Sequence, residues 1–117
     1  QSLAILEYLD ETYPEPPLLP KDAAARAWVR GFALINIADT HPLIVPRIRH
    51  YLLDDLKLSQ DQLLGWIRHW FDAGFAAMES LLAEHPESGS FCHGDSPTIA
   101  DIHTNPGSDD TSTWAES

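Results

Sequence analysis

Cysteine is almost absent from this chain of 117 residues, in which Cys92 is the only one. A single cysteine excludes a disulfide within the chain and fits a reducing compartment such as the cytoplasm. Long apolar runs are also missing, since no stretch approaches the roughly 18 residues that cross a bilayer. We therefore expect a cytoplasmic protein without a membrane span.

Basic residues are scarce: seven lysines and arginines stand against 18 acidic residues, which gives a net charge of −11. Nucleic acids and anionic membranes both attract basic surfaces, so we expect neither as a partner. The hydrophobic fraction of 44% is enough for a packed core. At this length the chain forms one domain or less.

The first residues carry neither a methionine nor a basic, apolar leader. This start predicts that the chain has no signal peptide. Because an amphipathic pattern is already present from the beginning, we expect the sequence to be a fragment of a longer protein.

Residues 2–13 have the spacing of an amphipathic helix, with Ser2 as the expected N-cap and Pro14 ending the helix. The apolar stripe of this helix consists of Leu3, Ile5, Leu6 and Leu9. Prolines dominate residues 14–20, so this segment is predicted to be a stiff, extended linker that holds Leu18 and Leu19 against a neighbouring body.

A second helix is predicted to start after Asp22, whose carboxylate can cap it. Pro42 and Pro46 should bend or break this helix, because proline lacks the amide donor and collides with the preceding turn. Helical structure is expected to resume over residues 47–56.

A third helix starts with a capping box, in which Ser59 and Gln62 satisfy each other's backbone N–H groups. Its predicted buried face contains Leu63, Ile67, Trp70, Phe71, Phe75, Met78 and Leu82. After a loop at 86–90, Thr98 and Asp101 predict a second box. With no convincing strand pattern, the fold class is predicted to be an all-α helical bundle.

Five segments together resemble the glutathione transferases, and the zeta class in particular, which contains the maleylacetoacetate and maleylpyruvate isomerases. They are residues 1–9 (Gln-Ser-Leu-Ala-Ile-Leu-Glu-Tyr-Leu), 18–20 (Leu-Leu-Pro), 41–43 (His-Pro-Leu) with Arg47, 91–95 (Phe-Cys-His-Gly-Asp) and 97–101 (Pro-Thr-Ile-Ala-Asp). The resemblance implies that residues 1–20 are the last helix and linker of a thioredoxin-like domain. It also implies that residues 21–102 belong to a helical C-terminal domain that is cut short, and that the polar tail at 103–117 falls outside the family pattern.

The family resemblance also implies a reaction, a glutathione-dependent cis–trans isomerisation in aromatic amino acid catabolism. The thiolate of glutathione adds to a conjugated double bond of an unsaturated dicarboxylate, rotation follows, and the thiolate leaves. The serine that activates this thiol in the family would precede Gln1, so we expect no catalytic residue here and no turnover by these residues alone. Family members are usually homodimers.

The resemblance assigns glutathione binding to Gln1 and Ser2, at the start of the first helix, where exposed N–H groups attract a carboxylate. Without the family match, Ser2 is read more simply as a helix cap. His41 and Arg47 match positions at the glutathione and substrate pocket, and a guanidinium binds carboxylates well. Read from the residues alone, they are a solvated, basic helix start. Ile44 and Val45 replace asparagines of many members, which leaves the substrate open.

No metal site is expected from the sequence, because Cys92, His93 and His103 match no zinc-binding spacing. Trp66 and Trp70 are interpreted as core or interface residues rather than a stacking platform. Besides the enzyme fragment, the sequence leaves open a non-catalytic helical protein-interaction module. Losing the helix that should follow Ile102 would expose apolar faces, so we expect the isolated chain to be molten, aggregated or dimeric.

Overall fold

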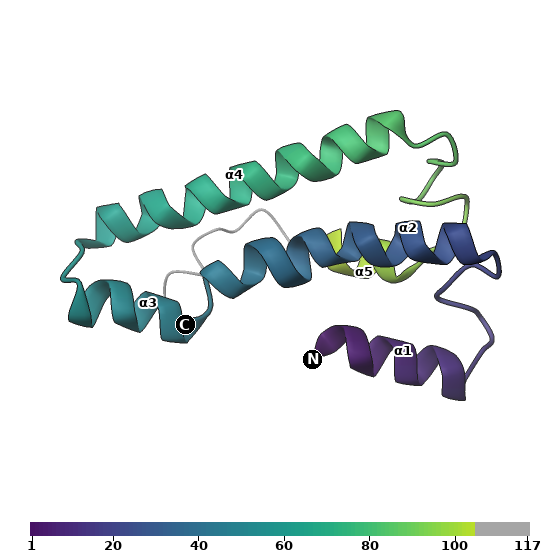
Figure 1. The fold of residues 1–117 in the computed structure, drawn as a ribbon, viewed down its shortest axis with the longest axis horizontal. Coiled ribbons are helices and arrows are strands. Elements are labelled where there is room, and N and C mark those ends of the chain that lie inside the picture. Colours follow the sequence, from purple (N-terminus) through teal and green to yellow (C-terminus); the bar gives the residue numbers. More distant parts are fainter. Residues whose placement is uncertain (105–117) are drawn as a thin grey trace.

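The computed structural model describes residues 1–104, and these residues are almost entirely helical (Figure 1). The helices are α1 (Ser2–Thr12), α2 (Ala23–Leu34), α3 (Pro46–His50), α4 (Gln60–Glu84) and α5 (Ile99–Thr104). Three short helical stretches of other pitch connect them: π-helical Ile35–Thr40 and Tyr51–Asp55, and 3₁₀-helical His41–Leu43. Over residues 1–104 there is no strand, only an isolated β-bridge between Ser88 and Gly94, so the all-α prediction is confirmed.

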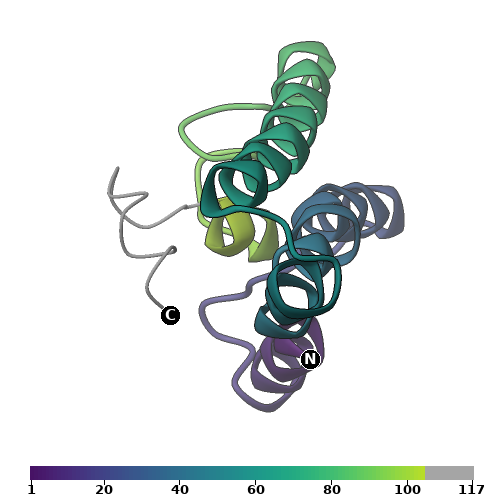
Figure 2. The ribbon, with the colours of Figure 1, turned by 90° about the vertical axis from the view of Figure 1, so that its left-hand side faces the viewer.

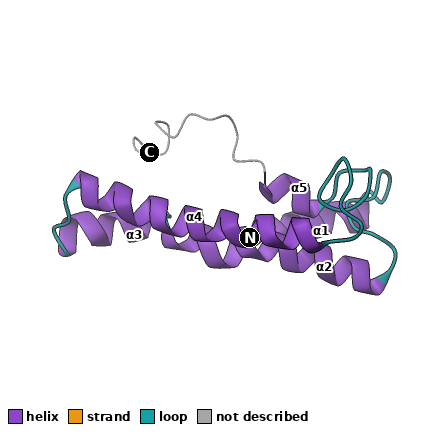
Figure 3. Ribbon diagram, turned by 90° about the horizontal axis from the view of Figure 1, so that it is seen from above, coloured by secondary structure: helices purple, strands orange, loops and turns teal. Residues whose placement is uncertain are grey.

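Two long helical rods form the body of the fold (Figures 1 and 2). The first runs from α2 through the π-helical stretch towards α3, and α4 returns antiparallel to it. Helix α1 lies on the opposite side of α2 from α4, and α5 lies beside α2 (Figures 1 and 3). Within the described residues, no helix is both long and apolar enough to cross a bilayer.

Helix α1 begins at Ser2, the residue predicted to cap it, so the cap lies one residue earlier. Gln1 is the N-cap and makes no side-chain capping bond, while Ser2 is already the first helical residue. The prediction of Ser2 as the cap is therefore wrong, because a capping residue must lie outside the helix that it caps. The predicted end is confirmed, since α1 stops at Thr12, before Pro14.

The proline-rich linker is held at both of its leucines, as the sequence predicts. Leu19 is buried and Leu18 is half-buried against the core. The N–H of Leu18 donates to Asp10 Oδ1 at 2.6 Å, and its carbonyl accepts from the N–H of Ile99 at 3.0 Å. The linker therefore connects α1 to the N-terminus of α5.

Asp22 caps α2 as predicted, with its carboxylate accepting from the N–H of Ala25 at 2.9 Å. The predicted interruption near the prolines is also confirmed, because regular α-helix stops at Leu34 and the chain passes through π and 3₁₀ geometry before α3. Pro46 is itself the first residue of α3, a position at which a helix has no use for the missing N–H.

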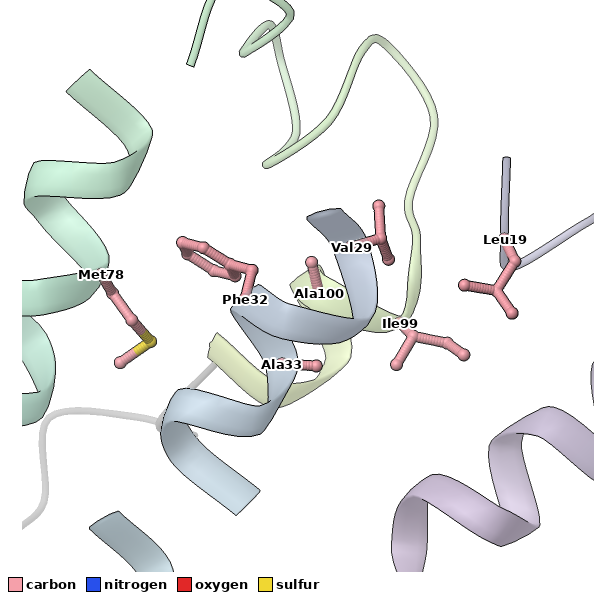
Figure 4. Packing of buried hydrophobic residues seen from close by; sticks show 7 residues of the cluster. All are labelled: Leu19, Val29, Phe32, Ala33, Met78, Ile99 and Ala100. Carbon is pink, nitrogen blue, oxygen red and sulfur yellow. The ribbon is translucent and has the colours of Figure 1, made fainter. Parts of the chain in front are cut away.

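The core lies between α2, α4, α5 and the linker (Figure 4). Val29, Phe32 and Ile99 are the largest fully buried side chains. The cluster is completed by Leu19, Ala33, Met78 and Ala100. Because Ala33 and Ala100 are small, α2 and α5 can approach closely at this point.

Helix α4 begins with the predicted capping box: Ser59 Oγ accepts from the N–H of Gln62 at 3.2 Å, and Gln62 Oε1 accepts from the N–H of Ser59 at 2.9 Å. The predicted buried face is only partly correct. Leu63 and Met78 are buried, but Phe75 is 38% exposed. The other predicted members, Ile67, Trp70, Phe71 and Leu82, are half-buried. The helix is 25 residues long, and too few described elements pack against it to cover the whole stripe.

At α5 the carboxylate arm of the second predicted box is present. Asp101 Oδ2 accepts from the N–H of Thr98 at 2.8 Å and from the Thr98 hydroxyl at 3.1 Å. Thr98 is buried, so this pair closes the N-terminus of the helix inside the fold. Of the polar tail expected at 103–117, residues 105–117 lie outside the described part of the chain.

Candidate functional site

Gln1 and Ser2 stand at the N-terminus of α1, where the first backbone N–H groups have no partner within the helix. Both side chains are exposed. This is the electrostatic setting that favours an anion, since the helix dipole places partial positive charge at the same end.

Helix α1 is held against α2 by one ion pair. Arg30 Nε donates to Glu7 Oε1 at 2.5 Å, and the two side chains are 35% and 31% exposed. With the Leu18–Asp10 hydrogen bond described above, this contact fixes the direction in which the N-terminus of α1 points.

His41 lies in the 3₁₀ turn and Arg47 in α3, and both side chains are exposed. The neighbouring Arg49 is used differently, because its Nε donates to the carbonyl of Ile44 at 2.8 Å. Ile44 is buried, so this side chain packs into the fold. Arg47 and His41 face solvent at this bend, as does His50 at the end of α3.

The N-terminal end of α1 points towards α3, and the two helices lie on the same side of the bundle (Figures 1 to 3). The two predicted groups therefore lie at the N-terminus of α1, for Gln1 with Ser2, and in the 3₁₀ turn and α3, for His41 with Arg47. None of the side-chain hydrogen bonds or ion pairs of the described residues joins the two groups.

A second polar cluster, which sequence reasoning missed, lies where α4 ends. His85 Nε2 is 2.9 Å from His93 Nδ1, and His93 Nε2 is 3.2 Å from Glu87 Oε2. The indole of Trp28 on α2 stacks on the His85 ring, with 3.6 Å between ring centroids and 8° between planes.

Electrostatics at this cluster favour neutral imidazole at His85. Burial lowers the pKa of His85, the nearby His93 lowers it further, and the Glu87 carboxylate opposes both effects. Sequence reasoning considered His93 with Cys92 and His103 instead. His85 and Glu87 are separated by one residue at a helix end, and this spacing did not indicate that they share a polar site with His93. The His103 side chain lies outside the described part of the chain.

No protein-family model matches the chain. The maleylpyruvate isomerase of a Ralstonia species is 43% identical over 106 residues, which cover 91% of this chain and 50% of that protein. The chain thus spans about half the length of the curated relatives it matches.

Solved structures with similar sequences share the fold. A bacterial maleylpyruvate isomerase, described as a zeta-class glutathione S-transferase, superposes with a TM-score of 0.85 at 44% identity, covering 88% of this chain and 49% of its own. A maleylacetoacetate isomerase from Methylobacterium extorquens, with malonate and glutathione bound, gives 0.82 at 40% identity, covering 88% and 48%. Over the part of these proteins that it spans, the chain matches zeta-class glutathione S-transferases in sequence and in fold.

Proposed function

We propose that the protein is a glutathione-dependent cis–trans isomerase of the maleylacetoacetate and maleylpyruvate type. The observation that carries this proposal is the shared fold and 44% identity with a solved maleylpyruvate isomerase across 88% of the chain. The activity requires a thiolate that adds to a conjugated double bond and leaves after rotation. This chain supplies part of the binding site for that chemistry.

In this proposal Gln1 and Ser2 bind the γ-glutamyl carboxylate of glutathione. Support comes from their exposed position at the start of an 11-residue helix, where partial positive charge and free N–H groups meet. A similar solved isomerase contains glutathione. Binding there would orient the tripeptide so that its cysteine lies near the second substrate.

His41 and Arg47 bind a carboxylate of the unsaturated dicarboxylate substrate. The bend after α2 exposes both, whereas Arg49 is tied to the backbone of the bend. A guanidinium offers two parallel N–H donors to a carboxylate, and its charge also stabilises the enolate that forms as the thiolate adds. Malonate, a small dicarboxylate, is bound in a similar solved isomerase.

We further propose a homodimer in the cytoplasm. The single cysteine fits a reducing compartment. Large apolar side chains that are 58% and 64% exposed, Ile5 and Tyr8 of α1, favour contact with a further protein surface. The same exposure supports the second candidate function, a non-catalytic module that only binds partners.

A chimera tests the proposal. Residues 1–102 of this chain replace the matching segment of the Ralstonia relative, and isomerisation of maleylpyruvate with glutathione is measured. We expect turnover within about tenfold of the parent, and loss of about one to two orders of magnitude in kcat/KM for Arg47→Ala, since a charged hydrogen bond contributes about 1.5–3 kcal/mol.

Arg68→Ala, an exposed arginine of α4, is the matched control and should leave kcat/KM unchanged. A folded chimera without activity would favour the interaction module instead. If Arg47→Ala and Arg68→Ala changed kcat/KM equally, Arg47 would not be part of the substrate site. The 117-residue chain by itself should show no turnover, and measurable turnover would contradict the expectation that its activating serine lies elsewhere.

A further inference from the structure

The cluster of His85, Glu87 and His93 has the composition of a metal site. Each residue offers one ligand atom, and the three atoms lie within 4.8 Å of one another. We propose that these three side chains bind one divalent transition-metal ion of the Zn²⁺ type. This inference does not depend on the isomerase function.

The separation of the two imidazoles in the cluster is close to what a zinc ion requires. Two imidazole nitrogens bound tetrahedrally to Zn²⁺, each at about 2.0–2.1 Å, are about 3.3 Å apart. His85 Nε2 and His93 Nδ1 are 2.9 Å apart, whereas the 3.2 Å contact of Glu87 Oε2 is with the other ring nitrogen of His93, Nε2. One ion binds one nitrogen of His93, so the two imidazoles would separate by a few tenths of an ångström. The exposed Glu87 side chain would turn from His93 Nε2 towards the ion, starting from a ligand separation within 4.8 Å.

The surrounding structure holds the ligands in position. Trp28 stacks on one face of the His85 ring, and the His93 side chain is only 13% exposed. Backbone hydrogen bonds brace the intervening loop, from the N–H of Gly94 to the carbonyl of Glu87 at 2.7 Å and from the N–H of Ser88 to that of His85 at 3.2 Å. Two of the three ligands therefore need little further ordering when the metal binds.

Glu87 provides the open side of the site. Its side chain is 64% exposed, so an ion and its waters can enter from solvent there. Two imidazoles and one carboxylate suit Zn²⁺ and its first-row neighbours, whereas Ca²⁺ and Mg²⁺ prefer oxygen ligands throughout. Three protein ligands leave a fourth position for water.

Calorimetric titration of Zn²⁺ into the chimera defined under Proposed function, prepared without a histidine tag, tests the site in a folded protein. We expect about one ion per chain. His93→Gln and Glu87→Gln should each weaken binding at least tenfold. Because Glu87 is exposed, its substitution leaves folding intact and keeps the test valid if His93→Gln disturbs the loop. His50→Gln, at an exposed histidine of α3, is the matched control and should bind as the parent does.

Absence of binding would overturn the proposal, as would equal affinities in the parent, His93→Gln and Glu87→Gln. A Cys92→Ser chain should also retain the ion. If instead Cys92→Ser abolishes binding while Glu87→Gln does not, the metal is held by the thiol and the assigned ligand set is wrong.

Discussion

Asp101 Oδ1 accepts a hydrogen bond from the backbone N–H of Cys92 at 2.8 Å, across nine residues of chain. The other oxygen of the same carboxylate accepts from the N–H of Thr98 at 2.8 Å. One side chain thus satisfies donors in the loop before α5 and at the start of α5. This places the loop relative to α2 and the core, because Ile99 and Ala100 are buried directly after Thr98.

Asp101→Asn should destabilise the fold by about 1–3 kcal/mol, because an amide has one acceptor oxygen and would leave a donor facing a backbone N–H. The measurement is urea unfolding of the chimera defined above, followed by tryptophan fluorescence. Asp72→Asn, on the exposed side of α4, is the control and should change the unfolding free energy by less than about 0.5 kcal/mol. Equal effects of the two substitutions would show that the Asp101 hydrogen bonds contribute nothing beyond surface charge.

The same carboxylate predicts a pH dependence. Burial raises the pKa of Asp101, but hydrogen bonds from Cys92 and Thr98 outweigh burial and hold it below its ordinary value of 3.8. When the pKa of a carboxyl is lower in the folded state than in the unfolded state, its ionised form stabilises the fold. This stabilisation is fully present above the pKa of the unfolded state and is lost as the pH falls through the pKa of the folded state. The stability difference between parent and Asp101→Asn chimeras should therefore shrink from about pH 5 downward. A difference that stays constant to about pH 2.5 would contradict this assignment.

Two glycines of α4 should respond in opposite directions to alanine. A Cβ on Gly74 would collide with the buried hydroxyl of Thr40, which also donates to the carbonyl of Ile35 at 3.2 Å. We expect Gly74→Ala to destabilise the chimera by about 1–3 kcal/mol, through overpacking. Gly65→Ala meets nothing within 4 Å and should stabilise by about 0.5–1 kcal/mol, since alanine favours helix. Thermal unfolding compares the two, and a stabilising Gly74→Ala would show that α4 and the π-helical stretch are not in close contact.

Local features of this fold were predictable from the sequence because they depend on neighbours three or four residues apart. The Asp22 cap, the Ser59–Gln62 box and the carboxylate arm at Asp101 all have this range. Pro42 and Pro46 likewise disturb only the helical turn that contains them, and the chain bends at these positions. The family motifs are also contiguous stretches of sequence.

Other features depend on which elements meet in space. The periodicity of α4 shows an apolar stripe but not how far its partners reach along it, so Phe75 is exposed where burial was predicted. The cap of α1 was misplaced by one residue, because serine is compatible with both a cap and a first turn. Arg47 is exposed, whereas the side chain of Arg49 donates a hydrogen bond to the backbone. This difference also depends on the path that the chain takes through the bend.

By itself the sequence determined the helices, the caps of α2 and α4, the broken second helix and the resemblance to the zeta-class family. Only the tertiary structure decided that His85, Glu87 and His93 meet, with Trp28 stacked on the first of them. The physical reason is the range of the interactions. A cap is formed within one turn of one helix, whereas that cluster requires α2 to pack against the end of α4 and the following loop to fold back over it.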